Sequence, residues 1–68
     1  MYLSNRVKEL RAKIGWTQTD LARQVEVSRQ TIAALEKDDY IPSLLLAMRV
    51  AQAFDLQVEE IFTLEDER

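Results

Sequence analysis

The sequence contains neither cysteine nor histidine, and it has one glycine and one proline among its 68 residues. Without cysteine and histidine there is no disulfide framework, no thiolate nucleophile, no imidazole base and no zinc site built from these ligands. One glycine is too few for a glycine-rich loop that cradles phosphate. We therefore expect no enzyme activity, no metal and no cofactor.

Long apolar runs are also missing. The longest, over residues 41–50, is interrupted by Pro42, Ser43 and Arg49 and is far shorter than the roughly 20 residues of a membrane span. The first residues lack the apolar core of a secretory signal. Since 47% of the residues are hydrophobic, we expect one small cytoplasmic domain over residues 1–68, with its own core and no membrane partner.

Apolar residues recur at the three-and-four spacing of an amphipathic helix in five segments. The first segment has Ser4 or Asn5 as an N-cap and ends at Gly15. The fourth is so apolar that it must be the central helix of a bundle. Residues 1–3 and 62–64 alternate, so they can pair as short strands. The residues expected to face the core are Leu3, Val7, Leu10 and Ile14 in the first segment, Leu21, Ala22 and Val25 in the second, Ile32 and Leu35 in the third, Leu44, Ala47, Met48, Ala51 and Phe54 in the fourth, and Val58, Ile61 and Phe62 in the fifth.

Residues 17–37 have the pattern of a helix-turn-helix. Thr17 and Ser28 each offer a hydroxyl N-cap, and Asp20 completes a near capping box in which aspartate replaces the usual Glu or Gln. Ala22 is small where the two helix axes must approach closely. The spacing, the small residue and both caps agree, so the pattern is a strong signal.

The outer face of the second helix in this motif carries side chains that can recognise bases. Arg29 can bond guanine O6 and N7 together, and Gln30 can bond adenine in the same bidentate way. Ala33 and Ala34 are small enough to let the helix lie deep against thymine methyl groups. We expect these four residues to contact bases. The alternative is that the polar pair is merely solvated beside a cap and that the alanines only favour the helix.

Five segments resemble Cro/CI-type (Xre-family) helix-turn-helix regulators: residues 6–11 (RVKELR), 17–22 (TQTDLA), 27–32 (VSRQTI), 40–44 (YIPSL) and 58–62 (VEEIF). The resemblance covers residues 3–64. It implies an all-α, five-helix bundle of the lambda-repressor-like type, with a possible strand element near residues 62–65. It also implies a homodimer that represses transcription at palindromic operators on double-stranded DNA. The expected phosphate contacts are Gln18, Ser28, Thr31, Lys37 and Tyr40.

Four residues depart from the pattern of that family, and one of them is Gln57, a poor N-cap where Ser or Thr is usual. Glu26 stands in the turn where glycine is common, and a left-handed conformation there would cost roughly 1 kcal/mol. Asp38 and Asp39 occupy a loop that faces phosphate in relatives, so we expect them to weaken contact with the DNA backbone.

The net charge of -3 argues against DNA binding only if charge is counted globally. Residues 1–37 carry seven basic and four acidic side chains, a balance of +3, whereas residues 38–68 carry two basic and eight acidic ones, a balance of -6. At a Debye length of about 8 Å, acids on the far side are largely screened from the helix in the groove. We expect selectivity to depend on base contacts and dimerisation.

A homodimer is expected because one helix-turn-helix reads only a few base pairs. The chain has more apolar residues near its end than a small core needs, and we expect these to form the dimer contact, with Leu56 and Ile61 at its centre. The residues of this expected contact are Leu56, Val58, Ile61, Phe62 and Leu64. The alternative is that Ile61 and Phe62 only close the bundle. Leu45 either marks a patch for another protein or is an ordinary exposed leucine.

Two other functions remain open within the same fold. An antitoxin would regulate its own operon while its acidic C-terminal half contacts a protein partner, a toxin. An interaction adaptor would keep the fold and lose DNA binding, which Asp38 and Asp39 favour. An enzyme that uses the exposed carboxylates ranks last, because they have no cleft to raise their pKa values.

Overall fold

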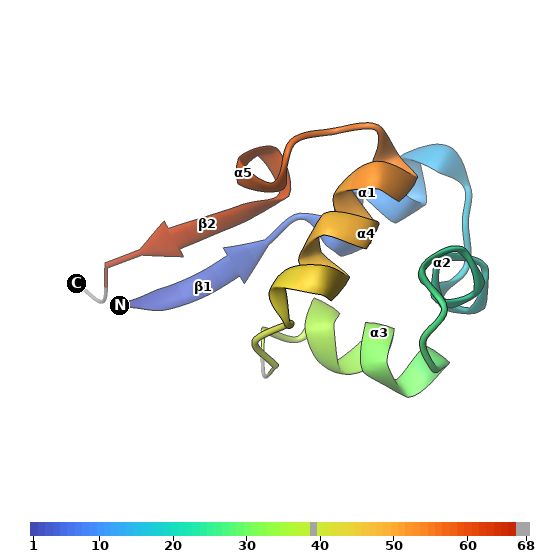
Figure 1. The fold of residues 1–68 in the computed structure, drawn as a ribbon, viewed down its shortest axis with the longest axis horizontal. Helices are drawn as coiled ribbons and strands as arrows, with labels where there is room; N and C mark the ends of the chain where they lie inside the picture. The colour runs from blue at the N-terminus through green and yellow to red at the C-terminus, as the bar shows by residue number, and fades with distance from the viewer. Residues whose placement is uncertain (39, 67–68) are drawn as a thin grey trace.

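Residues 1–38 and 40–66, the part of the chain that the computed structural model describes, form five helices and two strands. In chain order these are β1 (Tyr2–Asn5), α1 (Val7–Ile14), α2 (Gln18–Val25), α3 (Arg29–Glu36), α4 (Leu44–Phe54), α5 (Val58–Ile61) and β2 (Phe62–Glu65). Figure 1 shows α4 across the middle of the helices, and the strands extending together to one side. The predicted five helices with a short strand element are confirmed. Within the same residues, no helix is both long and apolar enough to cross a membrane.

The two strands pair in antiparallel fashion, from Tyr2 opposite Glu65 to Asn5 opposite Phe62. The predicted pairing of the chain's two ends is therefore confirmed. Leu3 lies in β1 and not in the first helix, as its spacing had suggested, because α1 begins only at Val7. It still packs against the core from the strand.

Short-range signals set most of the helix ends. The hydroxyls of Ser28 and Ser43 accept hydrogen bonds from backbone N–H groups three residues later. Asn5 Oδ1 accepts from the Val7 N–H at 3.0 Å, so Asn5, one of the two predicted caps, serves the first turn of α1 although Arg6 holds the N-cap position. Gly15 ends α1 with a φ of 87°, a conformation that glycine adopts without steric cost.

Three residues other than glycine hold the left-handed conformation, namely Glu26, Asp38 and Asp55, with φ between 57° and 61°. Each lies just after a helix, where this conformation turns the chain. The conformation suspected for Glu26 from the sequence is the one observed. At about 1 kcal/mol each, these positions cost the fold stability that glycine would not.

The core lies between the helices and is closed by the start of β2. Its buried side chains are Val7, Leu10, Leu21, Ala22, Val25, Ile32, Leu35, Leu46, Ala47, Val50, Ala51, Phe54, Ile61 and Phe62. The predictions for α2 and α3 are confirmed throughout. Those for Leu44 and Met48 are wrong: both are exposed, and Leu46 and Val50 take their places. Ile14 is likewise half exposed.

The end of the chain corrects the expected dimer contact. Ile61 is completely buried and Phe62 nearly so, both within the chain's own core. Leu56 and Val58 are half-buried and pack against that core. A side chain that is already inside the monomer has no surface to offer a partner, so Ile61 cannot be central to a dimer contact. Of the five expected residues, Leu64 alone is exposed.

Candidate nucleic-acid interface

The helix-turn-helix is built by α2 and α3, which pack on one another through apolar side chains. Leu21 and Val25 of α2 and Ile32 and Leu35 of α3 are all completely buried. The Thr17 hydroxyl accepts from the Asp20 N–H at 3.0 Å, and Asp20 Oδ2 accepts from the Thr17 N–H at 2.8 Å. The near capping box predicted at the start of α2 is therefore confirmed. Because one side of α3 is anchored, its other side has a fixed direction.

The outer side of α3 brings the predicted base-contacting residues together. Arg29 and Gln30 are exposed in the first turn, and Ala33 and Ala34 are partly exposed one turn later. Positions three and four residues apart share one face of a helix, so these four side chains form one strip. Lys37, also exposed, continues the strip at the end of α3.

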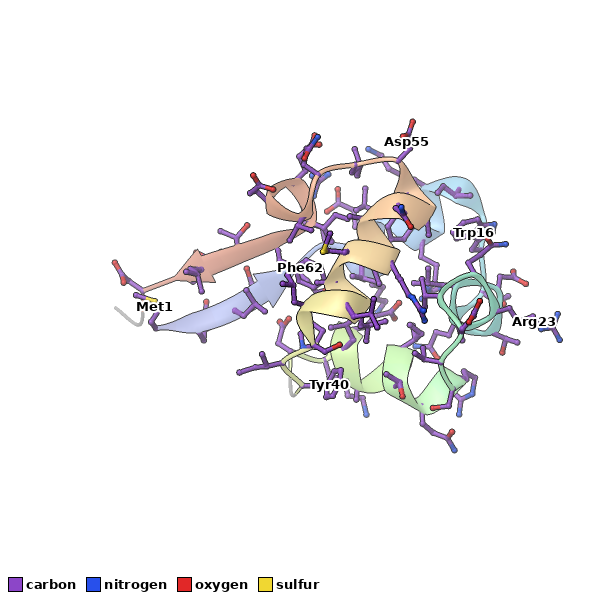
Figure 2. The ribbon with its side chains drawn as sticks, in the orientation of Figure 1. Met1, Trp16, Arg23, Tyr40, Asp55 and Phe62 are labelled. Atoms are coloured by element: carbon purple, nitrogen blue, oxygen red, sulfur yellow. The ribbon has the colours of Figure 1, made fainter. Side chains whose placement is uncertain are left out.

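The predicted phosphate-contacting residues come from three places. Ser28 and Thr31 lie at the start of α3, where the two hydroxyl oxygens are 3.0 Å apart and Ser28 also accepts from the Thr31 N–H. Gln18 lies in the first turn of α2 and is partly buried. Tyr40 stands in the connection before α4, at the far end of α3 from Arg29 (Figure 2). The structure thus joins Ser28 and Thr31 at the start of α3, whereas Gln18 hydrogen-bonds both Arg29 in the first turn of α3 and Glu36 in its last.

A chain of hydrogen bonds connects the core side of the motif to Arg29. Arg11 donates to both carboxylate oxygens of Glu36, at 2.8 and 3.2 Å, and to the Trp16 carbonyl at 2.8 Å. Gln18 Nε2 donates to Glu36 Oε1 at 3.1 Å, and Gln18 Oε1 accepts from Arg29 Nη1 at 3.1 Å. The amide of Gln18 is therefore oriented from one side, and its oxygen holds the Arg29 guanidinium in place.

The Arg11–Glu36 ion pair is largely shielded from solvent. The side chain of Glu36 is 5% exposed and that of Arg11 is 15% exposed. Burial raises the pKa of Glu36, but hydrogen bonds from Arg11 and Gln18 outweigh it, so the pKa of this carboxyl is lowered overall. The bond to Glu36 raises the pKa of Arg11 in turn. Both groups are therefore charged at neutral pH, and their ion pair links α1 to α3.

Asn5 ties the end of α3 to the strands. Its Nδ2 donates to the Leu35 carbonyl at 2.8 Å and to Asp38 Oδ1 at 2.9 Å. The Asp38 carboxylate therefore has a local partner and serves to stop α3. Asp39, the other acid expected to weaken phosphate contact, lies outside the described residues. Sequence reasoning missed the roles of Arg11, Glu36 and Asn5, because their partners are 25 to 33 residues away.

Within residues 1–38 and 40–66 there is no cluster of acidic side chains suited to hold a metal ion. The chemistry that the surface can perform is hydrogen bonding and charge pairing from Arg29, Gln30 and Lys37. Arg23, by contrast, points away from the bundle on α2 (Figure 2).

Comparison with known proteins connects this arrangement to transcriptional regulators. A family model described as helix-turn-helix matches residues 7–61. The chain is 52% identical over 65 residues to the HTH-type transcriptional regulator YgzD of Bacillus subtilis, covering 96% of this chain and 98% of YgzD. It is 48% identical over 65 residues to the HTH-type regulator MJ0272 of Methanocaldococcus jannaschii, with 96% and 98% covered. The immunity repressor protein of Bacillus phage phi105 is 38% identical over 61 residues, which cover 90% of this chain and 42% of the repressor.

Solved structures show the same fold. The restriction-modification controller protein C.AhdI from Aeromonas hydrophila superposes with a TM-score of 0.76 at 29% identity, covering 81% of this chain and 83% of C.AhdI. A protein from Bacteroides fragilis superposes with a TM-score of 0.79 at 26% identity, covering 90% of this chain and 98% of the other. Both likenesses include most of the helical bundle that carries the motif.

Proposed function

Since the chain belongs to the Cro/CI-type (Xre) family of helix-turn-helix transcriptional regulators, we propose that it represses transcription by binding a palindromic operator as a homodimer. In each half-site α3 lies in the major groove. Arg29 and Gln30 contact base edges, and Ala33 and Ala34 lie against the floor of the groove. Gln18, Ser28, Thr31, Lys37 and Tyr40 contact phosphates.

The observation that carries this proposal is the fixed position of an exposed arginine at the start of α3. Arg29 donates from Nη1 to Gln18, which leaves the other N–H groups of the guanidinium free for guanine O6 and N7. Gln18 uses one amide hydrogen for Glu36, so its second hydrogen is free for a phosphate oxygen. A side chain that is held before binding loses less conformational entropy on binding.

Repression is supported by the similar proteins, and pairing by the symmetry of a palindrome. One relative is an immunity repressor, and one structural neighbour is a controller protein of a restriction-modification system. A two-fold pair doubles the number of bases that are read and matches the symmetry of a palindrome. The small number of cationic side chains on the outer side of α3 makes this doubling necessary for affinity.

Selection of bound DNA from a random pool tests the proposal. We expect the protein to select a palindrome whose half-sites lie about one helical turn apart. The variants Arg29→Ala and Gln30→Ala should each relax the preference at one position per half-site and cost about 1–3 kcal/mol of binding free energy. Arg49→Ala and Gln52→Ala are the matched controls, since both change residues on α4 outside this surface, and they should leave the selected sequence unchanged.

Failure to select any sequence would contradict the proposal and favour an interaction adaptor. Equal effects of Arg29→Ala and Arg49→Ala would contradict the assignment of α3 as the reading helix. An antitoxin would select DNA and also co-purify with a basic protein bound to the acidic C-terminal half.

A further inference from the structure

The exposed apolar side chains of this small protein are concentrated on one part of its surface. Among the described residues, six large apolar side chains are more than half exposed; one is Met1 at the start of the chain, and the other five lie in the connection before α4, in the first turns of α4 and in β2. We call them the apolar corner: Ile41, Leu44, Leu45, Met48 and Leu64. None belongs to the proposed DNA-contacting set. Their function is therefore not explained by DNA binding.

The geometry of α4 and of the strands brings this set together. Leu44 and Met48 are four residues apart and share one strip of α4, on the side away from the buried Leu46 and Val50. In the strand pair, Leu64 shares a face with Phe62, because side chains alternate along a strand. Phe62 is buried, so this face is directed toward the helices.

The connection from α3 to α4 is anchored beside the strands. Asn5 of β1 donates to the Leu35 carbonyl and to Asp38, so the end of α3 lies against β1. Figure 1 shows the first turn of α4 close to the base of the strand pair. The apolar corner consists of the exposed apolar side chains of these two elements and of the connection before α4.

We propose that a second copy of this chain packs on the apolar corner, around a two-fold axis. The inference rests on the proposed homodimer and names the surface that forms it. It replaces the contact expected from the sequence, in which Ile61 and Phe62 were central. Leu64 is common to both.

The charge pattern favours a second copy over other occupants. Residues 40–48 and 62–64 contain no charged side chain, although 31% of the chain is charged. A two-fold contact places a surface against itself, so a charged patch would meet like charge, whereas an uncharged apolar patch is complementary to itself. Nucleic acid would require basic side chains here, and a basic protein would require acidic ones.

The exposed apolar area of the corner is also large enough for a specific dimer interface. Five such side chains expose on the order of 100 Å² of apolar surface each, or about a tenth of the accessible area of 4797 Å². Pairing two copies would bury on the order of 1,000 Å², the lower limit for a specific interface. The outer side of α3 shares no residue with the corner, so pairing leaves Arg29 and Gln30 accessible.

Sedimentation velocity over about 1–100 µM tests the proposal. The variants are Met48→Glu and Leu45→Glu, with Ile14→Glu as the matched control. Met48 is 54% exposed and Ile14 is 50% exposed, and Ile14 lies on α1, outside the corner. Because the three side chains are at least half exposed, glutamate should leave the circular dichroism spectrum unchanged.

We expect the wild-type chain and Ile14→Glu to be dimers. Met48→Glu and Leu45→Glu should raise the dimer dissociation constant by at least roughly 100-fold, because each places two carboxylates in the buried contact. The proposal is overturned if the wild type is a monomer throughout, if both corner variants dimerise as the wild type does, or if Ile14→Glu dissociates as they do. Failure of the proposed function would look different: the wild type would select no DNA, yet it would still dimerise through the corner.

Discussion

Removal of the Glu36 carboxylate should cost far more stability than removal of the Glu9 carboxylate. Both form an ion pair with an arginine at nearly the same distance, 2.8 Å for Arg11–Glu36 and 2.9 Å for Arg6–Glu9. The side chains of Glu36 and Arg11 are 5% and 15% exposed, whereas those of Glu9 and Arg6 are about half exposed. The two ion pairs therefore have the same chemistry, but one is shielded from solvent and the other is exposed to it.

The magnitude follows from what Glu36→Ala leaves behind. The substitution removes three hydrogen bonds, two from Arg11 and one from Gln18, and leaves the Arg11 guanidinium buried with the Trp16 carbonyl as its remaining partner. Breaking a buried pair in this way costs about 3 kcal/mol. A chain of this length is stabilised by about 3–10 kcal/mol in total, so the melting temperature should fall by about 12–24 °C. Glu9→Ala should cost less than about 1 kcal/mol.

Urea denaturation at pH 7 measures both effects. The double variant Arg11→Met, Glu36→Leu should lie within about 1 kcal/mol of the wild type, because replacing both partners by apolar side chains also removes the desolvation penalty. Equal losses for Glu36→Ala and Glu9→Ala would refute the reasoning. So would a double variant that loses as much stability as Glu36→Ala alone.

The same ion pair gives the sign of the acid dependence. The pKa of Glu36 is lowered in the folded chain relative to its ordinary value of 4.5. Its contribution to stability is therefore fully present above about pH 4.5 and is lost as the pH falls through the folded pKa. The difference in unfolding free energy between the wild type and Glu36→Gln should shrink between pH 7 and pH 3.

Two further predictions follow from backbone strain and from surface charge. Glu26→Gly should raise the unfolding free energy by about 0.5–1 kcal/mol in urea denaturation, because Glu26 holds a φ of 61° that glycine adopts without strain. Its ion pair with Arg49 is exposed and long, at 3.9 Å, so losing it should cost little. A loss of stability would show that the ion pair contributes more than the strain costs. Of the two cationic side chains on the outer side of α3, Lys37 alone is proposed to contact phosphate, so the slope of log K for DNA against log salt should be about -2 for a dimer. A slope near -10 would mean that other basic residues reach the backbone.

The elements that sequence reasoning predicted well depend on neighbours within a few residues. Thr17, Ser28 and Ser43 cap helices by accepting hydrogen bonds from N–H groups three residues later. Gly15 ends α1 in the left-handed conformation. The inner faces of α2 and α3 were also predicted, because each has a single apolar strip. Local chemistry determines these features, so the sequence alone suffices for them.

The hydrogen-bond chain behind Arg29 could not be predicted in this way. Arg11, Gln18 and Glu36 lie on three different helices, and each would be an ordinary polar residue on a solvated helix face. Their meeting depends on how α1, α2 and α3 are packed, which side-chain periodicity does not specify. The phosphate contact expected for Gln18 stays a prediction.

The wrong prediction that Leu44 and Met48 face the core and the proposed pairing surface have the same physical origin. Leu44, Leu45 and Leu46 follow one another, so the helix is apolar on more than one side and its periodicity does not single out the core face. The core takes the side of Leu46 and Val50, because α4 packs on the anchored α2 and on α5, and these two residues are buried there. The other side keeps Leu44 and Met48 in water, where apolar surface is costly unless it is covered. A helix with two apolar sides therefore indicates that one side packs in the core and the other packs on a partner. The variants Met48→Glu and Leu45→Glu test whether the exposed side makes the contact with the partner.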